Sequence, residues 1–308
     1  MESKFGHDPA SGARWEIHGP SEGRAVVEAW ANACIPFEPP KNSWKSELRD
    51  ALRSRCRMLE PLAGQLLHAT FFGAMPPRSD VENLLLYNID DSFKVPGSNG
   101  IRFEHGAGVP PTSDGREYPY CYRYLLAPQS GRFNYWQQVR QLAWFDWTDL
   151  GEFDDDKGVL AQVWLALSGG EVNLLELCAS EALFAVSVQL RPPRGISPLW
   201  GKLVKGVFDG LICAFQAHTD TKDLTQIVDR LASQLQTDAE VIKGYLLDER
   251  ITDQSRAVLG DVARLVFLRG SGVQWNPSDH LCMAGELLTA QPIDDRWAIK
   301  GEVVELSR

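Results

Sequence analysis

The stretch LLHATFFGAMPPRSDVENLLLYNIDD, residues 66–91, decides the fold, because its pattern returns as LFAVSVQLRPPRGISPLWGKLVKGVFDG, residues 183–210. Each copy passes from an apolar, strand-like run through Pro-Pro-Arg to an apolar, helix-like run that ends near an aspartate. Aligned from that aspartate, Asp90 meets Asp209 and Leu84 meets Leu203, with three extra residues after Pro-Pro-Arg in the second copy. Such an internal repeat predicts two related modules in one chain.

Outside the repeat, strand and helix patterns continue to alternate, which predicts an α/β class, with α+β as the alternative. We expect mixed sheets with flanking helices, arranged as a polar N-terminal arm (1–20), a first module (21–150) and a second module (151–308). Besides the repeat, the patterns predict helices over 22–33, 44–58, 223–235 and 238–247. They predict strands over 100–104, 117–126, 159–167, 263–268, 272–275, 281–288 and 297–304. Residues 1–14 are polar and predict a loose arm.

Composition limits the partners that the chain can take. With 44% hydrophobic and 23% charged residues in 308, the balance is that of a globular protein. The net charge of -10 repels nucleic acid, so phosphate binding would need a local basic patch or a bound metal. The six cysteines form no Cys-x-x-Cys pair and are expected to be reduced thiols. No segment is apolar enough for a membrane span or a leader, so we expect a soluble, cytoplasmic protein with no membrane partner.

Aromatic and acidic runs offer two further candidates. Tyr118, Tyr120, Tyr122 and Tyr124 alternate along a predicted strand, so their rings are expected on one face. Core packing is the favoured interpretation, and base stacking is the alternative. The acidic cluster around residues 152–156 lacks the spacing of a calcium loop and is expected to be a solvated turn.

The polar residues of the first copy could carry chemistry. On a helix, Asp80, Asn83 and Asp90 fall along one stripe, and Glu82 joins them if the first turn is irregular. Hard carboxylate oxygens are the ligands that Mg²⁺ prefers, and the ion retains water that can be activated. This stripe therefore predicts a magnesium site.

The same residues resemble a known family. Asp80-Val81-Glu82-Asn83-Leu84, followed by Asp90, is similar to the D-x-D-N-L-x-K-x-x-x-D helix signature of the RusA-type crossover-junction endodeoxyribonucleases, which cut Holliday junctions with Mg²⁺. The resemblance covers about thirty residues per copy. It implies a small α/β fold that acts as a homodimer, with acidic residues of both subunits grouped near the interface.

Neither copy holds the complete signature. In the first, Leu86 stands at the lysine position; in the second, Lys205 and Asp209 stand at the lysine and final aspartate positions, but the leading acids are absent. Asp279, in Trp275-Asn276-Pro277-Ser278-Asp279, is similar to the family's later acidic turn. The resemblance thus implies one composite site, with Asp80, Glu82, Asp90 and Asp279 as metal ligands and Lys205 against the phosphate.

Three function classes follow from this sequence. The first is a Mg²⁺-dependent, structure-specific nuclease acting on structured or branched nucleic acid. The second is a pseudoenzyme that keeps the fold and binds nucleic acid or a protein partner, which the net charge favours. The third is a small-molecule enzyme at the tryptophan-rich junction between the halves, residues 132–150. For single residues, helix capping by Asp80 and an exposed helix end at Asp90 are the structural alternatives.

Overall fold

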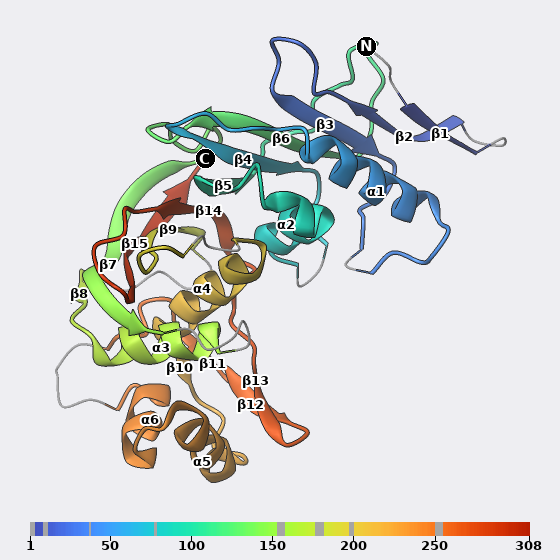
Figure 1. The fold of residues 1–308 in the computed structure, drawn as a ribbon. Helices are drawn as coiled ribbons and strands as arrows, with labels where there is room; N and C mark the ends of the chain where they lie inside the picture. The colour runs from blue at the N-terminus through green and yellow to red at the C-terminus, as the bar shows by residue number, and fades with distance from the viewer. Residues whose placement is uncertain are drawn as a thin grey trace.

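A computed structural model describes residues 4–8, 12–36, 38–76, 79–152, 158–175, 182–196, 200–249 and 255–308. Within these residues it is a mixed α+β fold built on one curved, 11-stranded mixed sheet (Figure 1). The sheet strands are β1 (Lys4–Asp8), β2 (Gly12–His18), β3 (Val26–Ala31), β4 (Gln65–Phe72), β5 (Gly100–His105), β6 (Tyr120–Pro128), β7 (Gln137–Gly151), β8 (Asn173–Leu174), β9 (Phe184–Arg191), β14 (Cys282–Thr289) and β15 (Trp297–Ser307).

The helices and the smaller strand pairs complete the described chain. The helices are α1 (Trp44–Cys56), α2 (Val81–Ile89), the 3-10 helix η1 (Asp90–Phe93), α3 (Val159–Gly169), α4 (Trp200–Ala214), α5 (Leu224–Leu235) and α6 (Ala239–Leu246). The smaller pairs are β10 (Ala217–His218) with β11 (Asp261–Val262), and β12 (Val266–Arg269) with β13 (Gly272–Trp275). No helix of the described ranges is long and apolar enough to cross a membrane.

Two groups of four strands in the large sheet are connected in the same way. Their spatial orders are β3-β6-β4-β5 and β7-β15-β9-β14. Each group contains one parallel pair, β4 with β5 and β9 with β14, and its other pairs are antiparallel. The chain runs β3-α1-β4-α2-β5-β6 in one group and β7-α3-β9-α4-β14-β15 in the other, where β8 and the segment from β10 to β13 are additional. The groups meet where β5 pairs antiparallel with β14.

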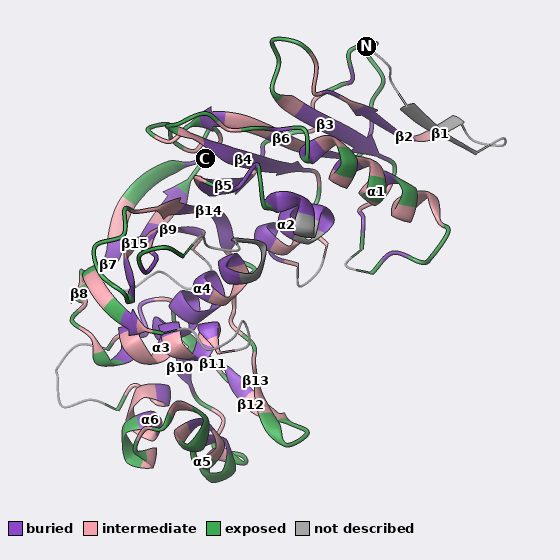
Figure 2. Ribbon diagram, viewed as in Figure 1, coloured by how far each residue is buried: buried purple, intermediate pink, exposed green. Residues whose placement is uncertain are grey.

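Burial explains which helices matter for the core. Strands of the sheet and helices α2 and α4 are largely buried, whereas α5 and α6 mix exposed, intermediate and buried residues and lie away from the sheet (Figure 2). Ser43 caps the N-terminus of helix α1, since its side chain accepts a hydrogen bond from Ser46 N at 3.3 Å, and the helix buries Leu48, Leu52 and Cys56. This is the i, i+4, i+8 stripe of an amphipathic helix.

Most of the predicted elements are confirmed, and three are wrong. Residues 22–33 were expected to be helical, but Val26–Ala31 forms β3, which pairs with a strand on each side. Residues 159–167 were expected to be a strand, but Val159–Gly169 forms α3. Both runs are short and apolar, so periodicity alone could not distinguish a buried strand from a buried helix. The expected loose arm instead contributes β1 and β2, which pair as a hairpin.

The tyrosine row belongs to the core. Tyr122 and Tyr124 are fully buried, and their hydroxyls bond Ile35 N at 2.9 Å and Leu85 O at 2.7 Å. Tyr118 precedes β6 and packs with Trp30 and Phe72 in a second cluster, so the four rings do not share one face. Core packing, not base stacking, therefore accounts for Tyr122 and Tyr124.

The cysteines follow the expected pattern where the structure describes them. Cys34, Cys56, Cys121, Cys213 and Cys282 are free thiols. Cys178 lies outside the described residues, as do Asp154, Asp155 and Asp156 of the acidic cluster.

Candidate functional site

The first part of the site is the N-terminus of α2. Asp80 precedes the helix, and its Oδ1 accepts a hydrogen bond from Asn83 N at 2.5 Å, which is the geometry of an N-cap. The capping role predicted as a structural alternative is therefore confirmed. The second carboxylate oxygen of Asp80 accepts from the Asn83 side-chain amide. Asp80 and Glu82 are nonetheless buried, at 6% and 7% exposure.

Helix α4 supplies the second part of the site. The Nζ atom of Lys205 lies 3.1 Å from Asp209 one turn along the same helix. It also lies 3.6 Å from Glu82 and 4.0 Å from Asp80, both at the start of α2. The acids of the first repeat copy and the lysine and aspartate of the second thus meet around one ammonium group.

Asp279 adds a fourth carboxyl group to those of Asp80, Glu82 and Asp209 around Lys205. It lies between β13 and β14, and burial together with Asp80 and Asp209 raises the pKa of its carboxyl to about 7. Burial, only partly offset by Lys205, likewise raises the pKa of Glu82 to about 8 and that of Asp209 to about 6. Burial alone would lower the pKa of Lys205, but the surrounding carboxylates outweigh it and raise that pKa. Four carboxyl groups therefore surround one lysine, whose single positive charge cannot neutralise all four when they are ionised.

The donor set fits a divalent cation by its chemistry. Asp80, Glu82, Asp209 and Asp279 offer hard oxygens, and the side-chain oxygen of Asn83 is buried beside Asp80 without a hydrogen-bond partner. In the arrangement shown, the ammonium of Lys205 lies among these carboxylates. As the side chains are placed, no three acidic, histidine or cysteine residues in the described part of the chain are positioned to hold a metal ion, so the fit rests on the chemistry of the donors and not on their spacing.

The predicted site residues divide into two sets. Asp80, Glu82, Asn83, Lys205, Asp209 and Asp279 are gathered, although they come from three separate elements of the chain. Asp90 begins η1 directly after α2, and its side chain lies outside the described residues. Sequence reasoning missed Gln216, whose side chain bonds the backbone of Ser278, beside Asp279. No local pattern could have indicated it, because the bond joins residues 62 positions apart.

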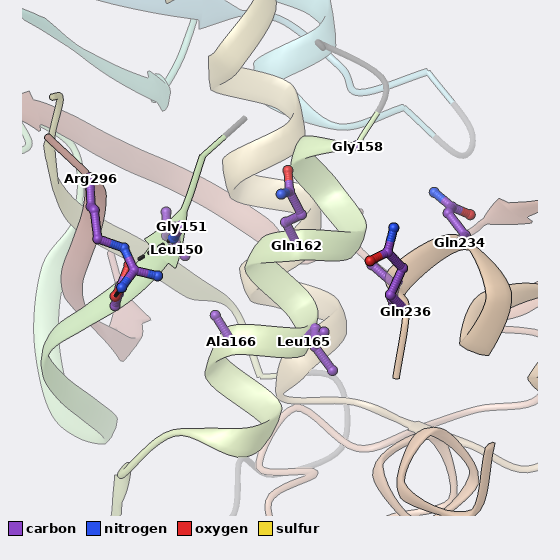
Figure 3. Close-up of a pocket in the computed structure, with 11 residues that line it drawn as sticks. Leu150, Gly151, Gly158, Gln162, Leu165, Ala166, Gln234, Gln236 and Arg296 are labelled. Atoms are coloured by element: carbon purple, nitrogen blue, oxygen red, sulfur yellow. Dashed lines mark hydrogen bonds and ion pairs between the residues drawn. The ribbon is translucent and has the colours of Figure 1, made fainter. Parts of the chain in front are cut away.

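A separate cavity of about 710 Å³ lies between α3, the end of α5 and β7. Figure 3 shows Arg296 on one side, Gln234 and Gln236 on the other, and Gln162 of α3 between them. Arg296 is paired with Asp149 at 2.9 Å. The described residues that line the cavity include no tryptophan and no member of the carboxylate and lysine group, so they offer less chemistry than the α2 and α4 site.

Comparison with protein-family models, with curated proteins and with solved structures finds no match to this chain.

Proposed function

We propose that this protein is a Mg²⁺-dependent phosphodiesterase that acts on structured or branched nucleic acid. The observation that carries the proposal is the meeting of Asp80 and Glu82 with Lys205 and Asp209 in one largely buried group. These are the residues whose pattern resembles the RusA-type signature, divided between the two repeat copies.

The proposed origin is a fusion of two diverged RusA-like modules. Support comes from the repeated strand order and from the antiparallel pairing of β5 with β14, which joins the two groups as a two-fold dimer interface would. Helices α2 and α4 also begin at matching repeat positions, Val81 and Trp200. Because the lysine is present only in α4 and the leading acids only in α2, the fusion would keep one site per chain.

Each residue has a defined role in this proposal. Asp80, Glu82, Asp209 and Asp279 would hold the metal ion, whose chemistry is to polarise the phosphate and to supply an activated water. Lys205 keeps its proton at neutral pH, since the carboxylates raise its pKa, and it can stabilise negative charge that develops on the phosphate. Its side chain is 31% exposed, so solvent and substrate can reach it.

Cleavage assays test the proposal. Branched, duplex and single-stranded DNA and RNA are incubated with the protein, with and without Mg²⁺ or Mn²⁺. We expect metal-dependent cleavage that Asp80→Asn and Asp209→Asn each reduce by at least about 100-fold. Asp149→Asn, which alters an exposed ion pair at the separate cavity, is the matched control and should cut normally. Cleavage that is independent of metal, or that survives both site substitutions, would sink the composite site.

A binding or assembly protein without catalysis is the second candidate. It is favoured by the position of Lys205, which already partners three of the carboxylates, and by the net charge of -10. In this alternative the ion pairs of Lys205 with Asp80 and Glu82 only hold α4 against the start of α2. The cleavage assay above then gives no product with any metal.

A further inference from the structure

The side chain of Gln216 binds the middle of the loop that carries Asp279, residues 276–281 between β13 and β14. Gln216 follows α4 by two residues and is 4% exposed. Its Oε1 accepts a hydrogen bond from Ser278 N at 3.1 Å, and its Nε2 donates to Ser278 O at 3.1 Å. One amide therefore satisfies both backbone groups of the residue directly before Asp279.

The position of Gln216 links this loop to the rest of the site. Phe215 N donates to Ile212 O, so the turn holding Gln216 continues directly from the helix that carries Lys205 and Asp209. The loop is also held at its ends, where Asn276 N donates to Leu265 O at 2.8 Å and Cys282 N donates to Asp279 O at 2.9 Å. The first contact joins the loop to the residue before β12 and the second closes a turn within it, whereas the Gln216 amide ties the loop to the turn that follows α4.

We infer that Gln216 is a positioning residue that holds Asp279 against α4 and thereby sets the affinity of the site for a divalent cation. The inference rests on the proposed function for its metal and adds a residue outside the carboxylate group. Groups that orient metal ligands commonly contribute 10- to 100-fold to metal affinity, roughly, without touching the ion. A buried, two-bond amide can also hold a loop in one arrangement, because leaving either backbone group unpaired is costly.

The test compares Gln216→Met and Gln216→Asn with Asn99→Leu in the full chain. Methionine keeps the length but loses both bonds, while asparagine keeps the amide but is one methylene too short. Asn99 is the matched control: its side-chain amide donates to Leu62 O at 3.0 Å and Gln65 O at 2.9 Å, just before β5, as the Asp279 loop lies just before β14. Hydrogen exchange by mass spectrometry and calorimetric titration with Mn²⁺ are measured on each variant.

Both Gln216 variants should speed amide exchange in residues 276–282 and weaken Mn²⁺ binding about 10-fold or more, whereas Asn99→Leu should change neither. Unchanged amide exchange in residues 276–282 would show that Gln216 does not hold the loop. Faster exchange with unchanged Mn²⁺ affinity would show that holding the loop does not set metal affinity. If the unaltered protein binds no Mn²⁺, the proposed function and the metal half of this inference fail together. The exchange data then still decide whether Gln216 fastens the loop to α4.

Discussion

Lys205 is the residue on which the two candidate functions differ most. Its ammonium lies 3.1–4.0 Å from three carboxylates, so it neutralises negative charge that a bound metal ion would otherwise balance. In a catalytic site the lysine is needed for turnover but competes with the metal for the carboxylates. If the proposed function holds, Lys205 weakens metal binding while supporting catalysis.

We predict that Lys205→Met abolishes cleavage and tightens Mn²⁺ binding by about 10-fold, because removing one positive charge at this distance is worth on the order of 1 kcal/mol or more. Calorimetric titration measures the affinity. Lys243→Met is the control, since Lys243 forms an ion pair with Glu240 at 3.8 Å at an exposed position on α6, away from the site. Weaker or unchanged metal binding in Lys205→Met would argue that the ammonium does not compete for these carboxylates.

The acids predict how stability depends on pH. Folding raises the pKa of Glu82 to about 8 and that of Asp279 to about 7, so the folded state favours their protonated forms. Such a contribution is complete below the unfolded pKa and is lost as pH rises through the folded value. The metal-free protein should therefore lose several degrees of melting temperature between about pH 5 and about pH 8.

Glu82→Gln should flatten this dependence, and Mg²⁺ should restore more stability at about pH 8 than at about pH 5. Thermal melts read by circular dichroism measure both effects. Glu240→Gln, at an exposed position on α6, should leave the dependence unchanged. A melting temperature that rises steadily over this pH range would contradict the direction given for Glu82 and Asp279.

At the scale of elements, the contact between α3 and α4 depends on two glycines. A methyl group at Gly210 would lie 2.6 Å from Leu160 O and 2.8 Å from Val163 Cβ, and one at Gly206 would lie 2.9 Å from Val159 Cγ1. These distances leave no room for a side chain. The glycines therefore allow α4, with Lys205 and Asp209, to approach α3 closely.

Gly210→Ala should destabilise the protein by about 1–3 kcal/mol, since the gain in helix propensity is smaller than the cost of overpacking. Gly244→Ala in α6 is the matched control, because the nearest atom to its added methyl is 3.4 Å away. The control should be neutral or stabilise by up to about 1 kcal/mol. Urea unfolding measures both, and equal effects at the two positions would refute the close approach of α3 and α4.

The repeat allowed much of this element order to be predicted. Apolar runs around Pro-Pro-Arg correctly predicted β4, α2, β9 and α4. The alignment of the two copies also grouped Asp80 and Glu82 with Lys205 in one predicted site, and the structure places these side chains together. The helix α3 was missed because its buried residues, among them Val159, Val163 and Leu167, also fit a buried strand. Gln216 could not be predicted, because its role depends on a long-range contact with Ser278.

At the scale of the whole molecule, the sheet makes the two groups of strands interdependent. Beta strands 5 and 14 pair along residues 100–104 and 284–288, and Arg102, 1% exposed, forms an ion pair with Glu286 across that junction. Main-chain bonds and a buried guanidinium therefore join the halves. Separate unfolding of either half would break both.

We accordingly predict a single unfolding transition. Melting curves from tryptophan fluorescence and from far-ultraviolet circular dichroism should coincide, because loss of one half exposes the edge strand and the charged pair of the other. Two separated transitions would show that the halves are independent domains.

The central claim is that acids from one half and lysine and aspartate from the other form one metal site per chain. Calorimetric titration of the metal-free protein with Mn²⁺ tests it most directly, using Asp80→Asn from the first half and Asp209→Asn from the second. We predict one class of Mn²⁺ site that either substitution weakens by at least about 10-fold. Binding that neither substitution affects, or the absence of Mn²⁺ binding in the unaltered protein, would contradict the claim.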